Sequence, residues 1–268
     1  MDIDLYIRNI DDSKLIGNGS NKKCFDFGDV VLLKYSCSDD YVESEFNNII
    51  GVKEKLDGNP VNAYKILDYK FDNGFFYVLE SKVNGYPIQE YKRNSMYEFD
   101  SVDEAVLYYN LSRVSVLKYI ERLKQLNNIS ILDKFFSDYV AIMKSGIVVD
   151  PSKTSNFLFD GKKVSFIDLN CHDNASSYGV NDIVYYMMYV ISWSSSLDAS
   201  MDEILEISFY LESIYKKIIS ISDFYGYKLG ITSFGKTCDD LISSKIDSFV
   251  SYSKSIDDYK KMVKMNTK

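Results

Sequence analysis

Cysteine, proline and histidine are all scarce in this sequence, and the low counts of cysteine and proline exclude several kinds of site and segment. Its 268 residues include four cysteines, three prolines and one histidine. The cysteines lie far apart and form no CxxC pair, which excludes a zinc knuckle by spacing and gives no disulfide framework. A reducing compartment is therefore expected. With three prolines and 13 glycines, the chain has no low-complexity tract and no long flexible linker.

Long apolar runs and an excess of basic residues are also missing. The longest nearly continuous apolar run, Ile183–Trp193, is too short to span a bilayer. The first residues lack the basic start and the apolar run of a signal peptide. We therefore expect a cytoplasmic protein without a membrane span. Export into a host cell stays open. The net charge of −8 disfavours nucleic acid as the main partner, because phosphate backbones are bound by Lys- and Arg-rich faces.

Residues 1–85 predict a small lobe of β-strands with one helix. A helix is expected over Tyr41–Leu56, because Asp39 and Asp40 are good N-cap residues and Asp57-Gly58 ends the pattern. The turn Asp72-Asn73-Gly74 is typical of a β-hairpin. Apolar and β-branched runs predict four strands, at Cys24–Phe27, Val30–Tyr35, Tyr64–Phe71 and Phe75–Ser81.

Residues 86–268 predict a larger helical lobe with one embedded hairpin. The hairpin strands are expected at Asn156–Phe159 and Lys163–Ile167, joined by Asp160-Gly161, which suits a type I′ turn. The expected fold class is therefore α+β, with an antiparallel β-rich lobe first and a helical lobe second. Apolar residues at helical spacing predict helices over Ser101–Tyr109, Ser112–Leu126, Leu132–Met143 and from about Val180 to about Tyr215.

A glycine-containing segment, Gly17-Asn18-Gly19-Ser20, precedes the first expected strand. Gly17 and Gly19 would let the backbone approach a triphosphate so that its N–H groups surround the phosphate oxygens. The segment is not a Walker A loop, because no Gly-Lys-Ser/Thr follows, and it does not match GxGxxG. The alternative is an ordinary hairpin turn. The pair Lys22-Lys23, which follows, is expected on a solvated face.

Lys34 lies inside the apolar run Val30–Tyr35. Lysine is rarely buried unless it is paired, so its ammonium must point outward or meet an acid from the following helix. Glu45 shares a helical stripe with Ile49 and Val52 and is therefore expected on the inward face. A Lys34–Glu45 pair would hold the ammonium against the α- and β-phosphates of a nucleotide. The alternative is an edge-strand lysine in solvent.

Asp150, Asn156 and Asp168 surround the expected hairpin. Asp150 follows the apolar stretch Gly146–Val149, Asn156 opens the first strand and Asp168 follows the second. A tight hairpin brings its two ends together, and two carboxylates with an amide oxygen form an all-oxygen set that suits Mg²⁺. Phosphoryl transfer also needs a carboxylate that orients the attacking hydroxyl and accepts its proton. We therefore expect metal on Asn156 and Asp168, with Asp150 as the base.

In this order, these residues resemble the protein-kinase-like superfamily. The nearest likeness is to its compact bacterial members: the aminoglycoside and choline kinase-like phosphotransferases and the minimal kinase effectors of bacterial pathogens. The resemblance spans roughly residues 13–195. Gly17-Asn18-Gly19-Ser20 looks like the glycine-rich loop, Lys34 like the lysine of the third strand, and Glu45 like its helix partner. The resemblance implies a bilobal kinase-like fold with lobes at 1–85 and 86–268.

The end of the small lobe carries the resemblance further. Phe76–Gly85 resembles the last strand of that lobe and the hinge, which implies that the backbone near Glu80, Lys82 and Val83 meets an adenine ring. The cofactors implied are ATP and Mg²⁺, or Mn²⁺ in its place.

The catalytic loop and the metal motif resemble the family with departures. Asp150 to Asn156 resembles the catalytic loop, in which Lys153 would touch the γ-phosphate. However, Asn156 comes six residues after Asp150 rather than five, and no His-Arg precedes Asp150. Asp168-Leu169-Asn170 occupies the place of Asp-Phe-Gly. Asp182 follows Asp168 by only fourteen residues, which leaves no room for an activation segment, so control by its phosphorylation is not expected.

The predicted function is an ATP- and magnesium-dependent kinase that phosphorylates a hydroxyl group on a protein (Ser/Thr) or on a small molecule. A host or regulatory protein is a candidate partner. Two alternatives stay open on the same fold. The shifted Asn156 and the valine before Asp150 motivate a pseudokinase or nucleotide-binding interaction module. The other alternative is a nucleotidyl transferase.

Overall fold

The structure is a computed structural model, and it divides the chain into two compact units. The first unit holds residues 1–84, 141–150 and 165–177, and the second holds 85–140, 151–164 and 178–268. The described residues are 2–18, 22–36, 39–88, 116–150, 156–171, 183–192 and 199–227, with the isolated positions 240, 243 and 247.

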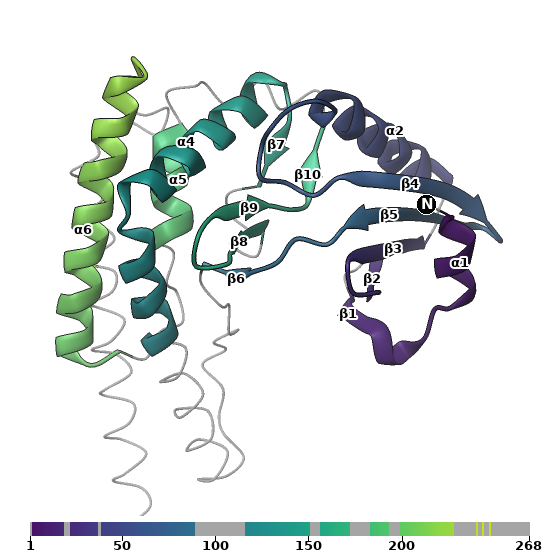
Figure 1. The fold of residues 1–268 in the computed structure, drawn as a ribbon, viewed down its shortest axis with the longest axis horizontal. Coiled ribbons are helices and arrows are strands. Elements are labelled where there is room, and N and C mark those ends of the chain that lie inside the picture. The colour runs from purple at the N-terminus through teal and green to yellow at the C-terminus, as the bar shows by residue number, and fades with distance from the viewer. Residues whose placement is uncertain are drawn as a thin grey trace, which may run out of the picture. The chain divides into compact units, whose positions relative to one another are not determined.

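The first unit is built on a five-stranded antiparallel sheet in the order β1-β2-β3-β5-β4 (Figure 1). Its tightest hairpin joins β4 to β5 at Asn73 and Gly74, whose φ angles of 48° and 78° are both left-handed, as a two-residue hairpin turn requires. The strands are β1 (Leu15–Asn18), β2 (Lys22–Asp26), β3 (Val30–Ser36), β4 (Ile66–Asp72) and β5 (Phe75–Ser81).

A short helix, α1 (Ile3–Arg8), covers one face of this sheet. Asp2 caps the helix by accepting a hydrogen bond from the Asp4 N–H at 3.0 Å. Ile3 is buried against side chains from three strands, which form a core cluster with it. That cluster consists of Ile3, Phe25, Val30, Leu32, Tyr77 and Leu79.

The longer helix α2 (Asp39–Leu56) packs on the opposite face. Phe46 of α2 meets the rings of Tyr69, Phe71 and Phe76, with centroid distances of 5.6, 5.4 and 5.8 Å. Neighbouring strand residues point to opposite faces, so Phe76 lies under α2 while Tyr77 belongs to the α1 core. The sheet is therefore covered on both faces.

Two later segments complete the first unit. The strands β7 (Val148–Val149) and β10 (Leu169–Asn170) form an antiparallel two-stranded sheet. They connect to α2, because Lys55 donates a hydrogen bond to the Gly146 carbonyl at 3.1 Å. A second link comes from β9, where the Phe166 N–H donates to the Asn62 carbonyl at 2.8 Å.

The second unit is mainly helical. Its β-strands are short, and Gly85 is required beside them, because a Cβ there would lie 2.9 Å from the backbone of Phe159. Ser200 begins α6 with a capping box, in which its hydroxyl accepts from the Glu203 N–H and the Glu203 carboxylate accepts from the Ser200 N–H. Its elements are β6 (Tyr86–Pro87), residues 116–126 as a helix, β8 (Phe157–Phe159), α5 (Ile183–Ser192) and α6 (Met201–Phe224), together with the larger part of α4 (Ile129–Lys144) and the first residue of β9 (Val164–Phe166).

The α+β class and the antiparallel sheet are confirmed, whereas the bilobal kinase-like fold stays a prediction. The strand Phe75–Ser81 has the predicted bounds, and α2 begins two residues before the predicted Tyr41. Sequence analysis missed α1, the strand β1 and the two-residue strands β6, β7 and β10. The expected helix Ser101–Tyr109 lies outside the described residues. No helix in the described ranges is long and apolar enough to cross a membrane.

Candidate functional site

The β7–β10 ladder brings Asp150 and Asp168 to one place. Val149 of β7 pairs with Leu169 of β10, and both side chains are buried. Asp150 follows Val149 directly, and Asp168 directly precedes Leu169. Because the two strands are antiparallel, both aspartates leave the same end of the ladder. Sequence analysis attributed their approach to the hairpin, but the pairing that places them is between β7 and β10.

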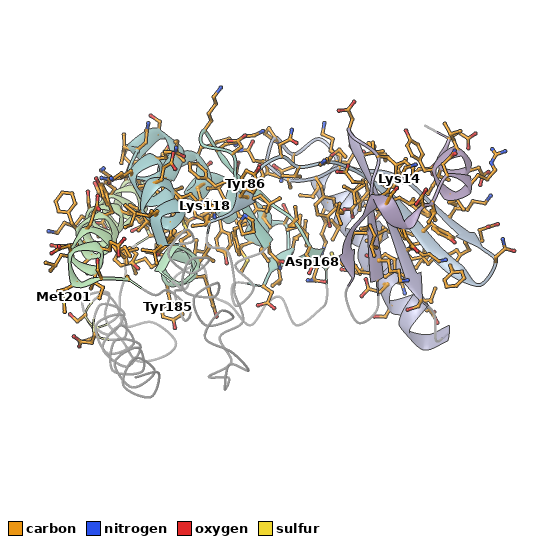
Figure 2. All side chains as sticks on the ribbon, turned by 90° about the horizontal axis from the view of Figure 1, so that it is seen from below. Lys14, Tyr86, Lys118, Asp168, Tyr185 and Met201 are labelled. Atoms are coloured by element: carbon orange, nitrogen blue, oxygen red, sulfur yellow. The ribbon has the colours of Figure 1, made fainter. Side chains whose placement is uncertain are left out.

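Asp168 has an unusual backbone (labelled in Figure 2). Its φ angle is +56°, in the left-handed region that residues other than glycine rarely adopt. Aspartate tolerates this region better than most residues, because its short polar side chain bonds locally. Backbone strain of this kind persists where the surroundings fix it, and it clusters at functional sites. Here the Asn170 side chain donates a hydrogen bond to the Asp168 carbonyl at 3.2 Å.

Asn48 of α2 holds the segment that follows Asp168. Its side-chain oxygen accepts a hydrogen bond from the Cys171 N–H at 2.5 Å, and its amide donates to the Asn170 side chain at 3.4 Å. Asn48 is 5% exposed, so both of its amide ends are satisfied inside the protein. Sequence analysis missed this residue. A polar residue next to Ile49 on the inward stripe of the helix is the signal that would have revealed it.

Lys22 of β2 contacts Asp168 directly. Its Nζ lies 2.5 Å from the Asp168 Oδ1, and the two side chains are 30% and 32% exposed. Desolvation acts to lower the pKa of Lys22, but the charge and hydrogen bond of Asp168, with smaller contributions from Glu80 and Cys24, raise it overall. Lys22 is therefore a charged, partly exposed ammonium within the site. Lys22 is therefore not on the solvent-exposed face that was predicted for it.

Lys34 lies on the other face of the sheet, contrary to the expected Lys34–Glu45 pair. Its Nζ lies 3.8 Å from the centroid of the Phe75 ring and 5.8 Å from that of Tyr77. Tyr35, the next residue in β3, points to the α2 face, where the charge of Glu45 reaches it. Successive strand residues point to opposite faces, so Lys34 points away from Glu45 and Asp168.

The α2 face beneath the site is acidic and poorly solvated. Burial raises the pKa of Glu80 to about 8, the nearby Lys22 opposes this rise, and Asp168 adds to it. Burial also raises the pKa values of Tyr35 and Tyr64 well above their usual range, with the charges of Glu80 and Asp168 adding to the effect. These groups therefore share one low-dielectric region with Lys22 as its cation.

The predicted glycine loop is described only in part. Gly17 is in β1 and pairs with Cys24, and a Cβ at Gly17 would make ordinary contacts of 3.5 Å with that cysteine. Packing therefore does not require a glycine at this position. Gly19 and Ser20 lie outside the described residues.

The predicted hinge residues lie at the end of β5. The Lys82 side chain pairs with Asp26 at 2.6 Å, and its N–H donates to the Asp29 carbonyl at 2.9 Å. That N–H is therefore already used within the sheet. Val83, the next residue, is partly exposed.

The predicted catalytic loop is described only at its two ends. Asn156 belongs to the second unit and is 3% exposed, and its side-chain amide has no hydrogen-bond partner among the described residues. Leaving a buried amide N–H without a hydrogen bond costs free energy, so such groups are normally paired. Lys153 lies outside the described residues.

Two carboxylates of the site could bind a metal ion. Asp150 and Asp168 supply carboxylate oxygens at the same end of one ladder. Within the described ranges, no group of three or more His, Cys, Asp or Glu side chains could hold a metal ion by itself. Mg²⁺ commonly takes one or two carboxylates and completes its shell with water and substrate phosphates. Two carboxylates are therefore compatible with Mg²⁺ only where further ligands complete its shell.

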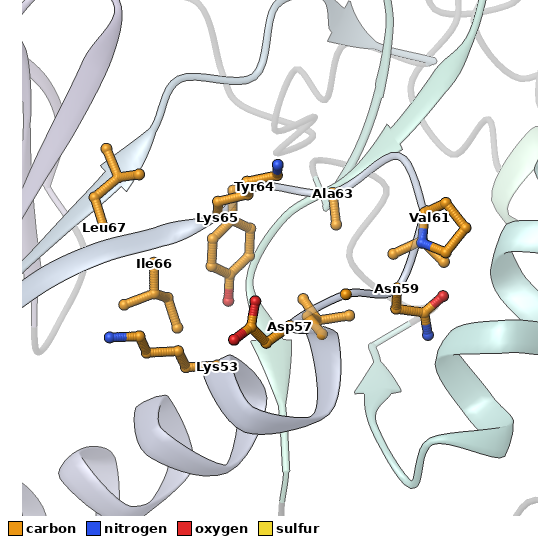
Figure 3. Close-up of a pocket in the computed structure, with 12 residues that line it drawn as sticks. Lys53, Asp57, Asn59, Val61, Ala63, Tyr64, Lys65, Ile66 and Leu67 are labelled. Carbon is orange, nitrogen blue, oxygen red and sulfur yellow. The ribbon is translucent and has the colours of Figure 1, made fainter.

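A separate hollow lies in the same unit, where α2 ends and β4 begins (Figure 3). Its volume is about 460 Å³, and its lining includes Lys53, Tyr64 and Lys65. The predicted site residues that the structure describes are not among its lining. Tyr64 also has a hydrogen bond to the backbone of Leu169, beside Asp168.

Comparisons with known proteins add no family. A scan against models of protein families finds no match, and a search of curated proteins finds no relative.

Proposed function

We propose that this chain is a kinase that transfers the terminal phosphoryl group of ATP to a hydroxyl group, with Mg²⁺ or Mn²⁺ as the metal. The observation that carries the proposal is the β7–β10 ladder, which brings Asp150 and Asp168 to the same end, with the Lys22 ammonium 2.5 Å from the Asp168 carboxylate. Phosphoryl transfer needs these groups: a carboxylate for the metal, a carboxylate for the acceptor hydroxyl and a cation for the phosphates.

Asp150 and Asp168 take different parts in the proposed reaction. The Asp150 carboxylate accepts the proton of the acceptor hydroxyl while that oxygen bonds to the γ-phosphorus; the bond from this phosphorus to the β–γ bridging oxygen breaks, and its electron pair leaves with ADP. Asp168 would hold the metal, which when bound neutralises charge on the phosphates.

The bilobal kinase-like fold is also a proposal. We infer a bilobal kinase-like arrangement from the order of the elements: a five-stranded sheet with α2 on one face, then helices, then the ladder that carries Asp150 and Asp168. In this arrangement the end of β5 would be the hinge, and Glu80, Lys82 and Val83 would be near the adenine.

Turnover with matched variants tests the function. ATP and Mg²⁺ should raise the melting temperature of the wild type, and ATP should be consumed when a cell lysate is supplied. Asp168→Asn should lose both the magnesium-dependent shift and the turnover, and Asp150→Asn should lose turnover by at least about a hundredfold while still binding ATP. Asp29→Asn, at an exposed position in the same unit, removes the same charge and should behave as the wild type. Full turnover in Asp150→Asn would refute the proposed role of this residue.

The acceptor class is read from the same assay with radiolabelled ATP. Label on a protein band indicates a protein acceptor, which would be a Ser or Thr hydroxyl, and label confined to small solutes indicates a small-molecule acceptor. A mass gain of AMP rather than of phosphate on the modified product would replace the kinase by a nucleotidyl transferase.

A second candidate function is nucleotide binding without transfer, as in a pseudokinase. One observation favours it: the Asp168 carboxylate is already paired with Lys22. In that case the wild type would bind ATP without consuming it, and Asp150→Asn would leave binding and any partner interaction unchanged.

A further inference from the structure

The sheet that faces the Asp150–Asp168 site offers an ammonium from β2 rather than from β3. We propose that Lys22, not Lys34, is the lysine that binds the phosphates of the nucleoside triphosphate. This inference rests on the proposed function, and it names the residue that forms the phosphate subsite.

The position of Lys22 supports this role in three ways. It begins β2, immediately after the glycine-containing segment, and it pairs in register with Tyr35 of β3. Paired residues on adjacent strands project to the same face, so Lys22 shares the α2 face with Tyr35. Its Nζ reaches the Asp168 Oδ1 at 2.5 Å, so the ammonium is already beside a proposed metal ligand.

The accessibility of Lys22 fits an anionic ligand. At 30% exposure, the side chain is held by the fold but keeps part of its surface open. A lysine binds phosphate as a point charge, and a triphosphate offers several oxygens where Asp168 offers one carboxylate. A phosphate oxygen can therefore share this ammonium with Asp168.

Lys34 is excluded from the same subsite by the strand geometry. Its ammonium lies 3.8 Å from the Phe75 ring, on the face that α1 covers. To meet Asp168 it would have to cross the sheet, which a side chain flanked by the paired strands β2 and β5 cannot do. Lys34 has a packing role instead, with its charge over two aromatic rings.

Nucleotide affinity separates the two lysines. In titration calorimetry with Mg²⁺ present, Lys22→Met should weaken ATP binding about ten- to hundredfold, because one charge-assisted contact to phosphate is lost. Binding of adenosine, which carries no phosphate, should change less than about twofold. Lys34→Met, the matched loss of charge on the other face, should leave both affinities unchanged. The unliganded melting temperature of each variant controls for folding.

A second measurement needs no variant. Wild-type protein is acylated with an amine-reactive reagent, and the modified lysines are identified by mass spectrometry. ATP with Mg²⁺ should protect Lys22 at least about tenfold, adenosine should not, and Lys34 should react equally in every condition.

The possible failures are distinguishable. If the wild type binds no ATP and transfers no phosphoryl group, the proposed function itself is overturned. If the wild type binds ATP but Lys22→Met binds it equally well, or if ATP protects Lys34 and leaves Lys22 reactive, the inference about Lys22 is overturned and the kinase proposal stands. A Lys22→Met variant that loses ATP and adenosine to the same extent also overturns it, because the loss is then not at the phosphates.

Discussion

Replacing Glu80 by glutamine should make the protein more stable at alkaline pH. Burial raises the pKa of the Glu80 carboxyl to about 8 in the folded protein, from an ordinary value of 4.5. Between these two pKa values the folded state holds a proton that the unfolded state has released, so the wild type loses stability as the pH rises. Glutamine has nearly the shape of the protonated acid and cannot ionise, so it avoids this loss.

The magnitude follows from the pKa difference. Each pH unit between the two values corresponds to about 1.4 kcal/mol, so the whole window from about pH 4.5 to 8 contains about 4 to 5 kcal/mol. Over the convenient range from pH 6 to pH 8, the free energy of unfolding of Glu80→Gln should therefore rise relative to the wild type by about 2 to 3 kcal/mol. Groups that titrate in both proteins cancel in this difference.

Urea unfolding at half-unit pH steps measures this difference. The matched control is Glu43→Gln, because Glu43 is an exposed carboxylate on α2 and its replacement changes the net charge equally. The Glu43→Gln curve should run parallel to the wild-type curve. If the Glu80→Gln curve is parallel too, or if this variant is the less stable one at pH 8, the Glu80 carboxyl is not desolvated as the structure has it, and the argument about a poorly solvated site fails.

Three further outcomes are expected. Asn48→Ala should lower the free energy of unfolding by about 1 to 3 kcal/mol, because the Cys171 N–H loses its partner, whereas Asn47→Ala at the exposed neighbouring position should change it by less than about 0.5 kcal/mol; urea unfolding compares them. Ser200→Ala should cost about 0.5 to 2 kcal/mol by removing the capping box of α6, and Ser200→Thr should recover most of it; an equal loss in both would contradict the capping role. Lys34→Met should lower stability by no more than about 1 kcal/mol, the scale of an exposed cation–π contact, with nucleotide affinity unchanged in the same samples.

The strands and the main helix of the first unit were predictable because their signals are local. The turn at Asn73-Gly74 and the β-branched run of β5 each specify structure within a few residues. The strands β7 and β10 were not predictable, because two-residue strands carry no periodicity and form by pairing residues that are far apart in the chain. Asp150 and Asp168 were singled out all the same, because each follows an apolar run.

The direction of the Lys34 side chain shows where sequence reasoning stops. In β3, Leu32 and Leu33 are both buried, because α1 covers one face of the sheet and α2 covers the other. A strand that is apolar on both faces has no alternation from which to read the direction of Lys34. The direction depends on which face α1 covers, and α1 was not predicted.

Gly51 lets α2 pack closely against the segment that follows Asp168. A Cβ at this position would lie 2.9 Å from the Cys171 Sγ and 3.2 Å from its Cβ, so only a residue without a side chain lets the helix come this close to the segment after Asp168. With Asn48 bonded to the same cysteine, helix and segment have little freedom to slide past one another. A ligand or partner that displaced α2 would therefore pull on the backbone of Asp168 as well, which gives the chain a mechanical route to its candidate catalytic carboxylate without an activation segment.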